Sequence, residues 1–270
     1  MTAPTTDLRR GRVRLAATFL RVGVMNEMQY RINFFLQLLQ SLLTVGTGLI
    51  VLAVVFSKTD ELGGWSRPQL LAVMGVFTLV GGVIRTFIQP NMERVVNDVR
   101  EGELDFALTK PADAQLLVSV REVRFWQLTD VLVGLAVLGV ALVQLRSTMQ
   151  WHHVVAFVAL LLSGLVSIYC FWLMLASASF WLVRINEVQE LFDGLFRAGQ
   201  YPVGIYPGWL RYGLTFIIPL AFAITVPSEA VTGRLAWQPV VVMVGFTIVL
   251  LFVSRWCWRR GLRRYGGASA

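Results

Sequence analysis

The sequence predicts an all-α integral membrane protein with six transmembrane helices in one domain, residues 1–270. The chain is 56% hydrophobic and 15% charged, with a mean hydropathy of +0.64, whereas soluble domains are roughly 45–50% apolar and about 25% charged. Long uncharged stretches recur along it, and a membrane-spanning helix needs about 20 apolar residues. Disordered proteins and nucleic-acid-binding modules are poor interpretations of such a composition, so we expect no nucleic-acid partner.

Uncharged stretches give the approximate bounds of each span. The first lies between Arg31 and Lys58, where 26 residues without charge exceed the ~30 Å needed to cross the hydrocarbon core. The second follows Arg67 and is expected to stop at Pro90. The third has the shortest uncharged stretch, so it must begin earlier and include Asp130. The six predicted spans are 32–57, 68–89, 125–145, 154–183, 210–228 and 235–256.

The basic residues predict the orientation. Of the 24 Lys and Arg residues, 20 lie in the two termini and in the segments 85–124 and 184–211, and four lie in the alternate loops. Cytoplasmic loops carry the excess of basic residues in membrane proteins. We therefore expect both termini and the two longer loops in the cytoplasm, with little structure on the other side.

Three cytoplasmic segments have distinct patterns. Residues 8–33 alternate basic and apolar positions, as in an amphipathic helix on the anionic lipid of the inner leaflet. Residues 184–199 predict an interfacial helix with a stripe of acids, for which we favour solvent exposure over metal binding. The loop 90–124 mixes both charges over some 35 residues, which suits docking to another protein, although a solvated loop with internal ion pairs is the alternative.

Motifs for enzyme chemistry are missing from the sequence. A phosphate-binding loop needs a glycine-rich turn followed by Lys and Ser or Thr, and neither Lys58 nor Lys110 follows such a turn. The nucleophile elbow and the zinc-binding helix motif are also missing. Cys170 and Cys257 lie in apolar runs and are expected to be packing residues. We therefore predict a protein that is no enzyme and has no cofactor or metal of its own.

Arg85 and Asp130 are the ionisable residues expected closest to the interior of the bilayer. Such residues are usually paired or functional. We expect them to form an ion pair between the cytoplasmic ends of spans two and three, with a role in gating as the alternative. Other deep charges are lacking, which disfavours an ion-coupled secondary carrier.

Three separated segments of the sequence resemble the type-2 ABC-exporter permease family. They are YRINFFLQLLQSLL, REGELDFALTKP and QYPVGIYPGWLRYGLTFIIPLAFAITVPSEAVTGR. The similarity extends over essentially the whole chain and is strongest to the bacterial viologen-exporter-like branch. It implies the permease subunit of an ATP-driven exporter in the bacterial inner membrane. The subunit would pair with an identical or homologous second permease and bind a dimer of a separate cytoplasmic ABC ATPase, which holds the ATP and Mg.

The resemblance also implies roles for particular segments. Residues 12–30 would form a connecting helix on the membrane, and a coupling helix within 97–111 would contact the ATPase. Its candidate residues are Glu101, Gly102, Glu103, Leu104, Asp105, Leu108 and Lys110. Spans two and five would line the translocation path, where the candidates are Phe77, Phe87, Phe216 and Phe222.

The substrate class follows less directly. Aromatic side chains bind cations through their ring faces, so amphipathic or cationic small molecules fit the expected path, but plain helix packing is the alternative interpretation of each aromatic residue. Two other functions stay open on the sequence. One is an ion-coupled carrier, and the other is a membrane anchor or sensor that recruits a cytoplasmic partner without transport.

Overall fold

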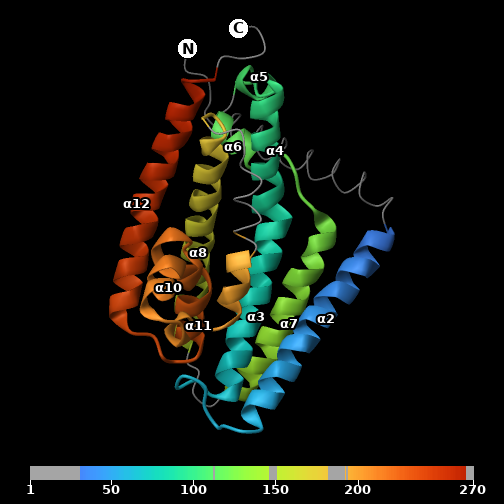
Figure 1. Cartoon of the computed structure of the whole chain (residues 1–270), viewed down its shortest axis with the longest axis vertical. Coiled ribbons are helices and arrows are strands. Elements are labelled where there is room, and N and C mark those ends of the chain that lie inside the picture. Colours follow the sequence, from blue (N-terminus) through green and yellow to red (C-terminus); the bar gives the residue numbers. More distant parts are fainter. Residues whose placement is uncertain (1–30, 112, 146–150, 182–191, 193, 266–270) are drawn as a thin grey trace, which may run out of the picture.

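Long helices packed side by side form an elongated bundle in the computed structural model of the chain (Figure 1). The structure describes residues 31–111, 113–145, 151–181, 192 and 194–265. Within this part, five helical stretches are long and apolar enough to cross a membrane. They are 34–56 in α2 (Arg31–Phe56), 67–101 in α3 (Arg67–Val83) with its extension, 125–145 ending in α7 (Leu128–Leu145), α8 (Trp151–Ala178) and α12 (Trp237–Leu262).

The second of these stretches is one continuous helix of 35 residues. It begins at the N-cap Ser66, whose backbone N–H donates to Oε1 of Gln69 at 3.0 Å. A π-helical turn, η1 (Ile84–Ile88), joins α3 to α4 (Gln89–Glu101). The helix was expected to stop at Pro90, but Pro90 lies in the first turn of α4, directly after the π-helical turn. The carbonyl of Thr86, four residues before the proline, accepts instead from the backbone N–H of Arg124 at 3.1 Å, which replaces the bond that the proline cannot make. At 1.5 Å per residue, the helix is longer than the ~30 Å hydrocarbon core, so polar α4 extends beyond the membrane.

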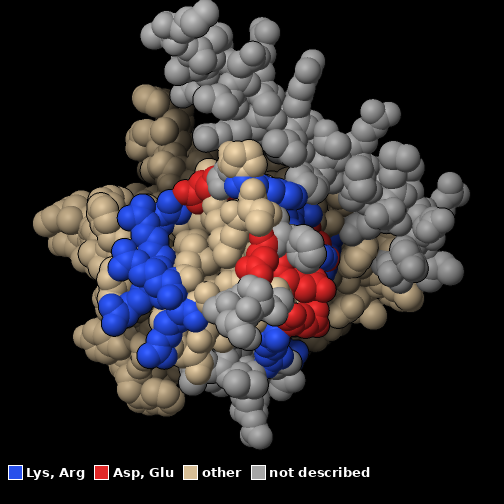
Figure 2. Space-filling view, turned by 90° about the horizontal axis from the view of Figure 1, so that it is seen from above, with Lys and Arg blue, Asp and Glu red and all other residues tan. Residues whose placement is uncertain are grey.

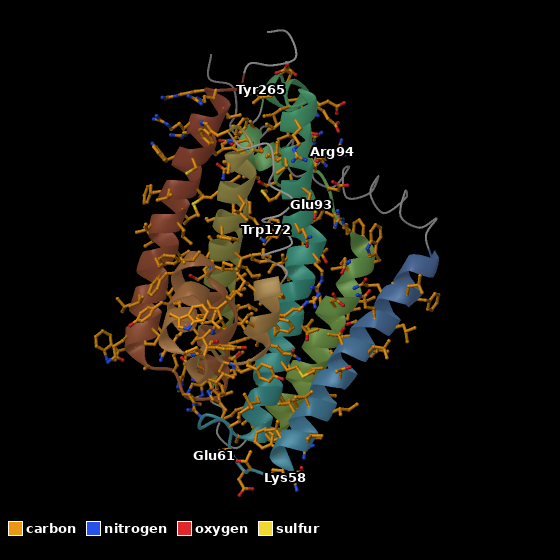
Figure 3. All side chains as sticks on the ribbon, viewed as in Figure 1. Lys58, Glu61, Glu93, Arg94, Trp172 and Tyr265 are labelled. Carbon is orange, nitrogen blue, oxygen red and sulfur yellow. The ribbon has the colours of Figure 1, made fainter. Side chains whose placement is uncertain are left out.

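The segment after α4 forms one end of the bundle. Gly102, at φ 74°, ends α4 in the left-handed conformation, which glycine adopts at low cost. The short helices α5 (Asp105–Leu108), α6 (Ala114–Val118) and η2 (Phe125–Gln127) then lead into α7. We call the end formed by α4, α5, α6 and the last two turns of α12 the charged end. The loops 57–66 and 232–236 form the opposite end, with Lys58 and Glu61 (Figure 3).

Close backbone contact joins α3 to α7. A Cβ added to Gly75 or Gly82 would lie 2.7 Å from the backbone nitrogen of Leu138 or Val131, respectively, and one added to Gly134 would meet the backbone nitrogen of Leu79. Small residues allow such approach between membrane helices, where packing drives association. These glycines therefore fix the distance between the two helices.

Phe192 and residues 194–205 contribute buried side chains to the bundle, among them Phe192, Phe196 and Val203, although 184–199 was expected on the membrane surface. Phe196 stacks on Phe77 of α3 with centroids 4.9 Å apart, and a Cβ on Gly63 of the opposite end would lie 2.8 Å from Ile205. Burial of the apolar side of this segment outweighs the expected surface location. The expected acids Glu187, Glu190 and Asp193 and the predicted connecting helix 12–30 lie outside the described residues.

The predicted span 210–228 is broken. Helices α10 (Gly208–Tyr212) and η5 (Gly213–Ile217) are followed, after a bend of 80°, by η6 (Ala221–Thr225) and α11 (Val226–Val231). Pro219 lies in the bend and forces the residue before it, Ile218, to be extended. The chain enters this pair from Ile205 beside Gly63 and leaves it at Arg234, which donates to the carbonyl of Gly64. The bent helix pair thus begins and ends near the opposite end of the bundle.

The break in this span also changes the end of the bundle to which one basic residue is assigned. Arg211 was counted with the cytoplasmic segments, but it and Arg234 both interact electrostatically with Glu229. Arg211 therefore lies toward the opposite end. The break at Pro219 explains the difference, because a straight helix would place Arg211 and Glu229 on opposite sides of the membrane.

The first prediction concerns the contact between α3 and α7. Gly134→Ala should lower the free energy of unfolding by about 1–3 kcal/mol, because overpacking forces the helices apart. Gly139→Ala on the same helix is the matched control, since a Cβ there meets nothing within 4 Å and alanine favours the helix. Detergent-solubilised protein unfolded by SDS titration gives both values, and equal stability of the two variants would contradict the close contact.

Candidate functional site

The predicted coupling residues lie at the charged end and divide into two groups. The backbone N–H groups of Glu103 and Leu104 donate to the carbonyl of Asp98 at 2.8 and 3.3 Å, which turns the chain sharply after α4. Leu104 is buried and Asp105 half-buried. The exposed group comprises Glu101, Glu103, Leu108 and Lys110. Buried Leu104 thus fixes the turn in place, and the neighbouring exposed residues form a surface that carries both charges.

Tyr265 packs beneath this turn from the end of α12. Its ring makes an edge contact with Phe180 at 6.1 Å between centroids. Burial, and to a lesser extent the charge of Asp105, raises the pKa of Tyr265. The Tyr265 side chain lies partly buried at the charged end, beside the turn (Figure 3).

Two ion pairs hold the return segment 119–124 against α4. Arg121 Nη1 lies 2.6 Å from Asp98 Oδ2, and Arg124 Nη2 lies 2.7 Å from Glu93 Oε2. Asp98 is buried, and Arg121 together with Arg94, 3.8 Å away, supplies the compensating charge that a buried carboxylate needs. Short, charge-assisted bonds of this kind are among the stronger hydrogen bonds in proteins. They join the two ends of the 102–124 segment into one unit with α4.

Asn91 satisfies the backbone at the same junction. Its Oδ1 accepts from the backbone N–H of Arg121 at 2.8 Å and of Glu122 at 2.9 Å. Its Nδ2 donates to the carbonyls of Glu122 and Phe87, each at 2.7 Å. Asn91 is buried, so these bonds replace the water that the loop backbone would otherwise need.

A second set of contacts joins α6 to α8 and α12. Asp113 caps α6 by accepting from the backbone N–H of Gln115 at 3.0 Å, and it lies 2.5 Å from Arg255 of α12. Gln115 and Ser119 bond to the hydroxyl of Tyr169 on α8 at 3.1 and 2.8 Å. The hydrogen bond from Arg255 holds the pKa of Asp113 below its usual value, helped by backbone N–H groups of α6. The segment 102–124 is therefore bonded to three of the long helices.

Arg85 and Asp130 are brought together where α3 meets α7. Arg85 donates from Nη2 at 2.6 Å and from Nε at 3.1 Å to the same oxygen of Asp130. Gln37 of α2 lies 3.4 Å from both oxygens. The Asp130 side chain is only 4% exposed, so the pair must stay intact to avoid a buried, uncompensated charge. This cluster connects α2, α3 and α7.

The four aromatic residues expected along the path lie in three places. Phe216 and Phe222 are 5.9 Å apart, and both pack on Phe246 of α12. Phe77 stacks elsewhere, on Phe196, and Phe87 is exposed on η1. Phe222 is buried against α8, where a Cβ on Gly164 would lie 2.6 Å from its carbonyl oxygen. The broken helix thus brings two of the four together and leaves the other two apart.

Comparison with known proteins agrees with this architecture. The family model described as ABC-2 family transporter protein matches residues 42–269. The chain belongs to the ABC-2 family. No curated protein and no solved structure matches it. Membership supports a multi-pass permease subunit of an ABC transporter. The narrower likeness to viologen exporters stays a prediction.

Several residues that organise the charged end of this ABC-2 protein were not singled out in the sequence. They are Asn91, Asp98, Asp113, Arg121, Arg124 and Arg255. Asp113 had a recognisable signal, because an Asp directly before a run of helix-forming residues predicts an N-cap. The others had none, since their partners are 23 to 142 positions away in the sequence.

The second prediction concerns the buried pair in the membrane. Asp130→Asn should lower the free energy of unfolding by about 3 kcal/mol, because Arg85 loses its charged partner. The double variant Asp130→Asn with Arg85→Gln should recover part of that loss, since no lone charge remains. Asp60→Asn, at an exposed position, controls for the loss of one carboxylate. SDS unfolding of wild type, both single variants (Asp130→Asn and Arg85→Gln), the double variant and the control gives the values, and additive effects of the two substitutions would contradict the pairing.

The third prediction is a pH dependence at α6. Because the pKa of Asp113 is lowered in the folded protein, its contribution to stability is present at neutral pH and is lost as the pH falls below the usual Asp range, near 4. Asp113→Asn keeps the N-cap and removes the charge, so it should lower the unfolding temperature at pH 7. At pH 3 the difference in unfolding temperature between wild type and the variant should be smaller. An equal gap at both pH values would contradict a charge-dependent bond to Arg255.

Proposed function

We propose that this chain is one permease half of an ATP-driven exporter. It works with a second, identical or homologous permease and is driven by a dimer of a separate cytoplasmic ABC ATPase, which binds ATP and Mg. The charged end faces the cytoplasm of a bacterium, and both termini lie on that side of the inner membrane.

One observation carries this proposal: the 102–124 segment has exposed charges at its tip and is bonded to α4, α8 and α12 at its base. Ion pairs within the loop also fit a solvated loop, but the bonds to Tyr169 of α8 and Arg255 of α12 go beyond what such a loop needs. A loop that docks a moving partner needs such support, because a flexible loop would bend instead of passing the movement of the partner to the helices. Glu101 and Glu103 supply exposed negative charge, and electrostatic complementarity favours a basic surface on the partner.

Two routes could carry motion from the docked ATPase into the membrane. The first is α4, which continues without a break into α3 and so moves with the spanning helix. The second is α6, whose bonds to Tyr169 and Arg255 connect it to α8 and α12. Movement of the segment would therefore shift these helices relative to one another, as alternating access requires.

The broken helix supports the proposed substrate class. Phe216 is exposed while its neighbours Phe222 and Phe246 support it from below. An exposed ring on a rigid aromatic base offers an apolar surface and a negative ring face. We propose amphipathic or cationic small molecules as the cargo.

The fourth prediction tests the docking surface. Reversing the charge at Glu103 and Asp105, both to Arg, should reduce the ABC ATPase that copurifies with the chain by about tenfold or more, because like charges then face each other. Mass spectrometry of the affinity-purified complex identifies and quantifies that subunit, and vesicle efflux should fall with it.

The matched control reverses Asp60 and Glu61, two exposed acids at the opposite end. This variant has the same net charge as the Glu103 and Asp105 variant and should retain the ATPase. Both variants must elute as folded protein in gel filtration. Undiminished ATPase recovery and efflux in the Glu103 and Asp105 variant would refute the assignment. Efflux driven by an ion gradient without nucleotide would refute the exporter.

A further inference from the structure

Two exposed tryptophans on α12 are spaced by about the thickness of a membrane. Trp237 and Trp256 are both highly exposed, at 71% and 60%, and they are 19 residues apart. At 1.5 Å per residue this is about 28 Å, close to the ~30 Å thickness of the hydrocarbon core. Exposed tryptophans gather at the two interfaces of a membrane. Trp256 therefore marks the level of the lipid headgroups at the charged end.

Basic residues begin at that level. Arg259, Arg260, Arg263 and Arg264 are all exposed. Arg259 and Arg260 follow Trp256 by three and four residues in α12 and share its face of the helix, and Arg263 and Arg264 come directly after Leu262, the last residue of the helix. The guanidinium of Arg260 lies 5.5 Å from the ring centroid of Trp256. Figure 2 shows a band of basic side chains on the side of the charged end where α12 lies, with an acidic patch at one end of the band and the larger group of acidic side chains across the face from it.

This face continues the lipid-facing surface of the helix. Phe252, one turn before Trp256, is 74% exposed, as membrane-facing apolar residues are. The other face of α12 is used for packing, since Trp258 is buried and Gly261 lies directly against Phe180. A lipid whose acyl chain lies along Phe252 and Trp256 therefore has its headgroup beside Arg259 and Arg260.

No neighbouring carboxylate among the described residues pairs with these four arginines. Helix α12 contains no Asp or Glu, and among the described residues no carboxylate forms an ion pair with any of the four. Arg255, in contrast, is engaged by Asp113. Guanidinium groups bind phosphate oxygens through two parallel hydrogen bonds. Four of them at headgroup depth favour a negatively charged phospholipid over a zwitterionic one.

We propose that the end of α12 is a binding site for anionic phospholipid. The phosphate is held by Arg259 and Arg260 at the level of Trp256, Arg263 and Arg264 add positive potential, and the acyl chains lie along the exposed apolar face. The site requires only that α12 spans a bilayer. It is therefore independent of ATPase docking, which uses the acidic surface of the 102–124 segment.

Native mass spectrometry of the purified full chain tests the site. The protein is released from detergent that contains equimolar phosphatidylglycerol and phosphatidylcholine, and the retained copies of each lipid are counted. Wild type should retain phosphatidylglycerol selectively, and Arg259→Gln with Arg260→Gln should lower that selectivity about tenfold or more. Arg94→Gln with Arg100→Gln, on α4 at the same end and both exposed, removes the same charge and should keep it.

Two further variants keep the test decisive. Arg259→Lys with Arg260→Lys preserves charge and should retain most of the selectivity, whereas Trp256→Ala should lower the total lipid retained without changing any charge. Equal selectivity in the glutamine variant and wild type would overturn the site, as would equal losses in the α12 and α4 variants. Loss of copurifying ATPase with unchanged lipid selectivity would assign these arginines to a protein partner and also overturn it.

Discussion

Close contact between the backbones of α3 and α7 is the constraint on which the rest of the structure depends. Glycines in both helices remove the side chains that would hold them apart, and the ion pair of Arg85 with Asp130 joins them at the side where α4 begins. Since α3 continues through the π-helical turn into α4, its position fixes where α4 leaves the membrane. The location of the 102–124 segment follows from that.

Polar interactions are concentrated where water or a partner can reach. At the charged end, buried Asp98 and Asn91 are matched by an arginine and by backbone groups of the return segment. This arrangement costs little outside the hydrocarbon core and, together with the few buried apolar side chains of the loop such as Leu104 and Val118, gives the loop a defined shape. A defined loop connected to α4, α8 and α12 is suited to passing the movement of a partner to the membrane. An unsupported loop of the same charge is not.

The sequence was sufficient for the class of the protein and for five of its long helices, because the need for about 20 apolar residues leaves a clear signal. It also suggested the contact of Arg85 with Asp130, since deep charges of opposite sign have few other partners. The course of residues 194–236 was not predicted. Pro219 is a local signal for a break, but apolar content fits a straight span and a broken pair equally, and the way the second half of the pair packs after the 80° bend also depends on tertiary contacts such as that of Gly164 with η6. The helix through Pro90 was missed for a similar reason, because a π-helical turn has no simple sequence signature.

The identity of the partner at the charged end is tested most directly by photo-crosslinking in cells. A photoreactive amino acid is placed at Glu103, and a second protein carries it at Glu61, which is equally exposed at the opposite end. The crosslinked products are then identified by mass spectrometry. We expect a subunit with ATPase motifs attached at position 103 and not at position 61. Crosslinks at 103 to lipid alone, or an ATPase attached only at 61, would contradict the proposed docking.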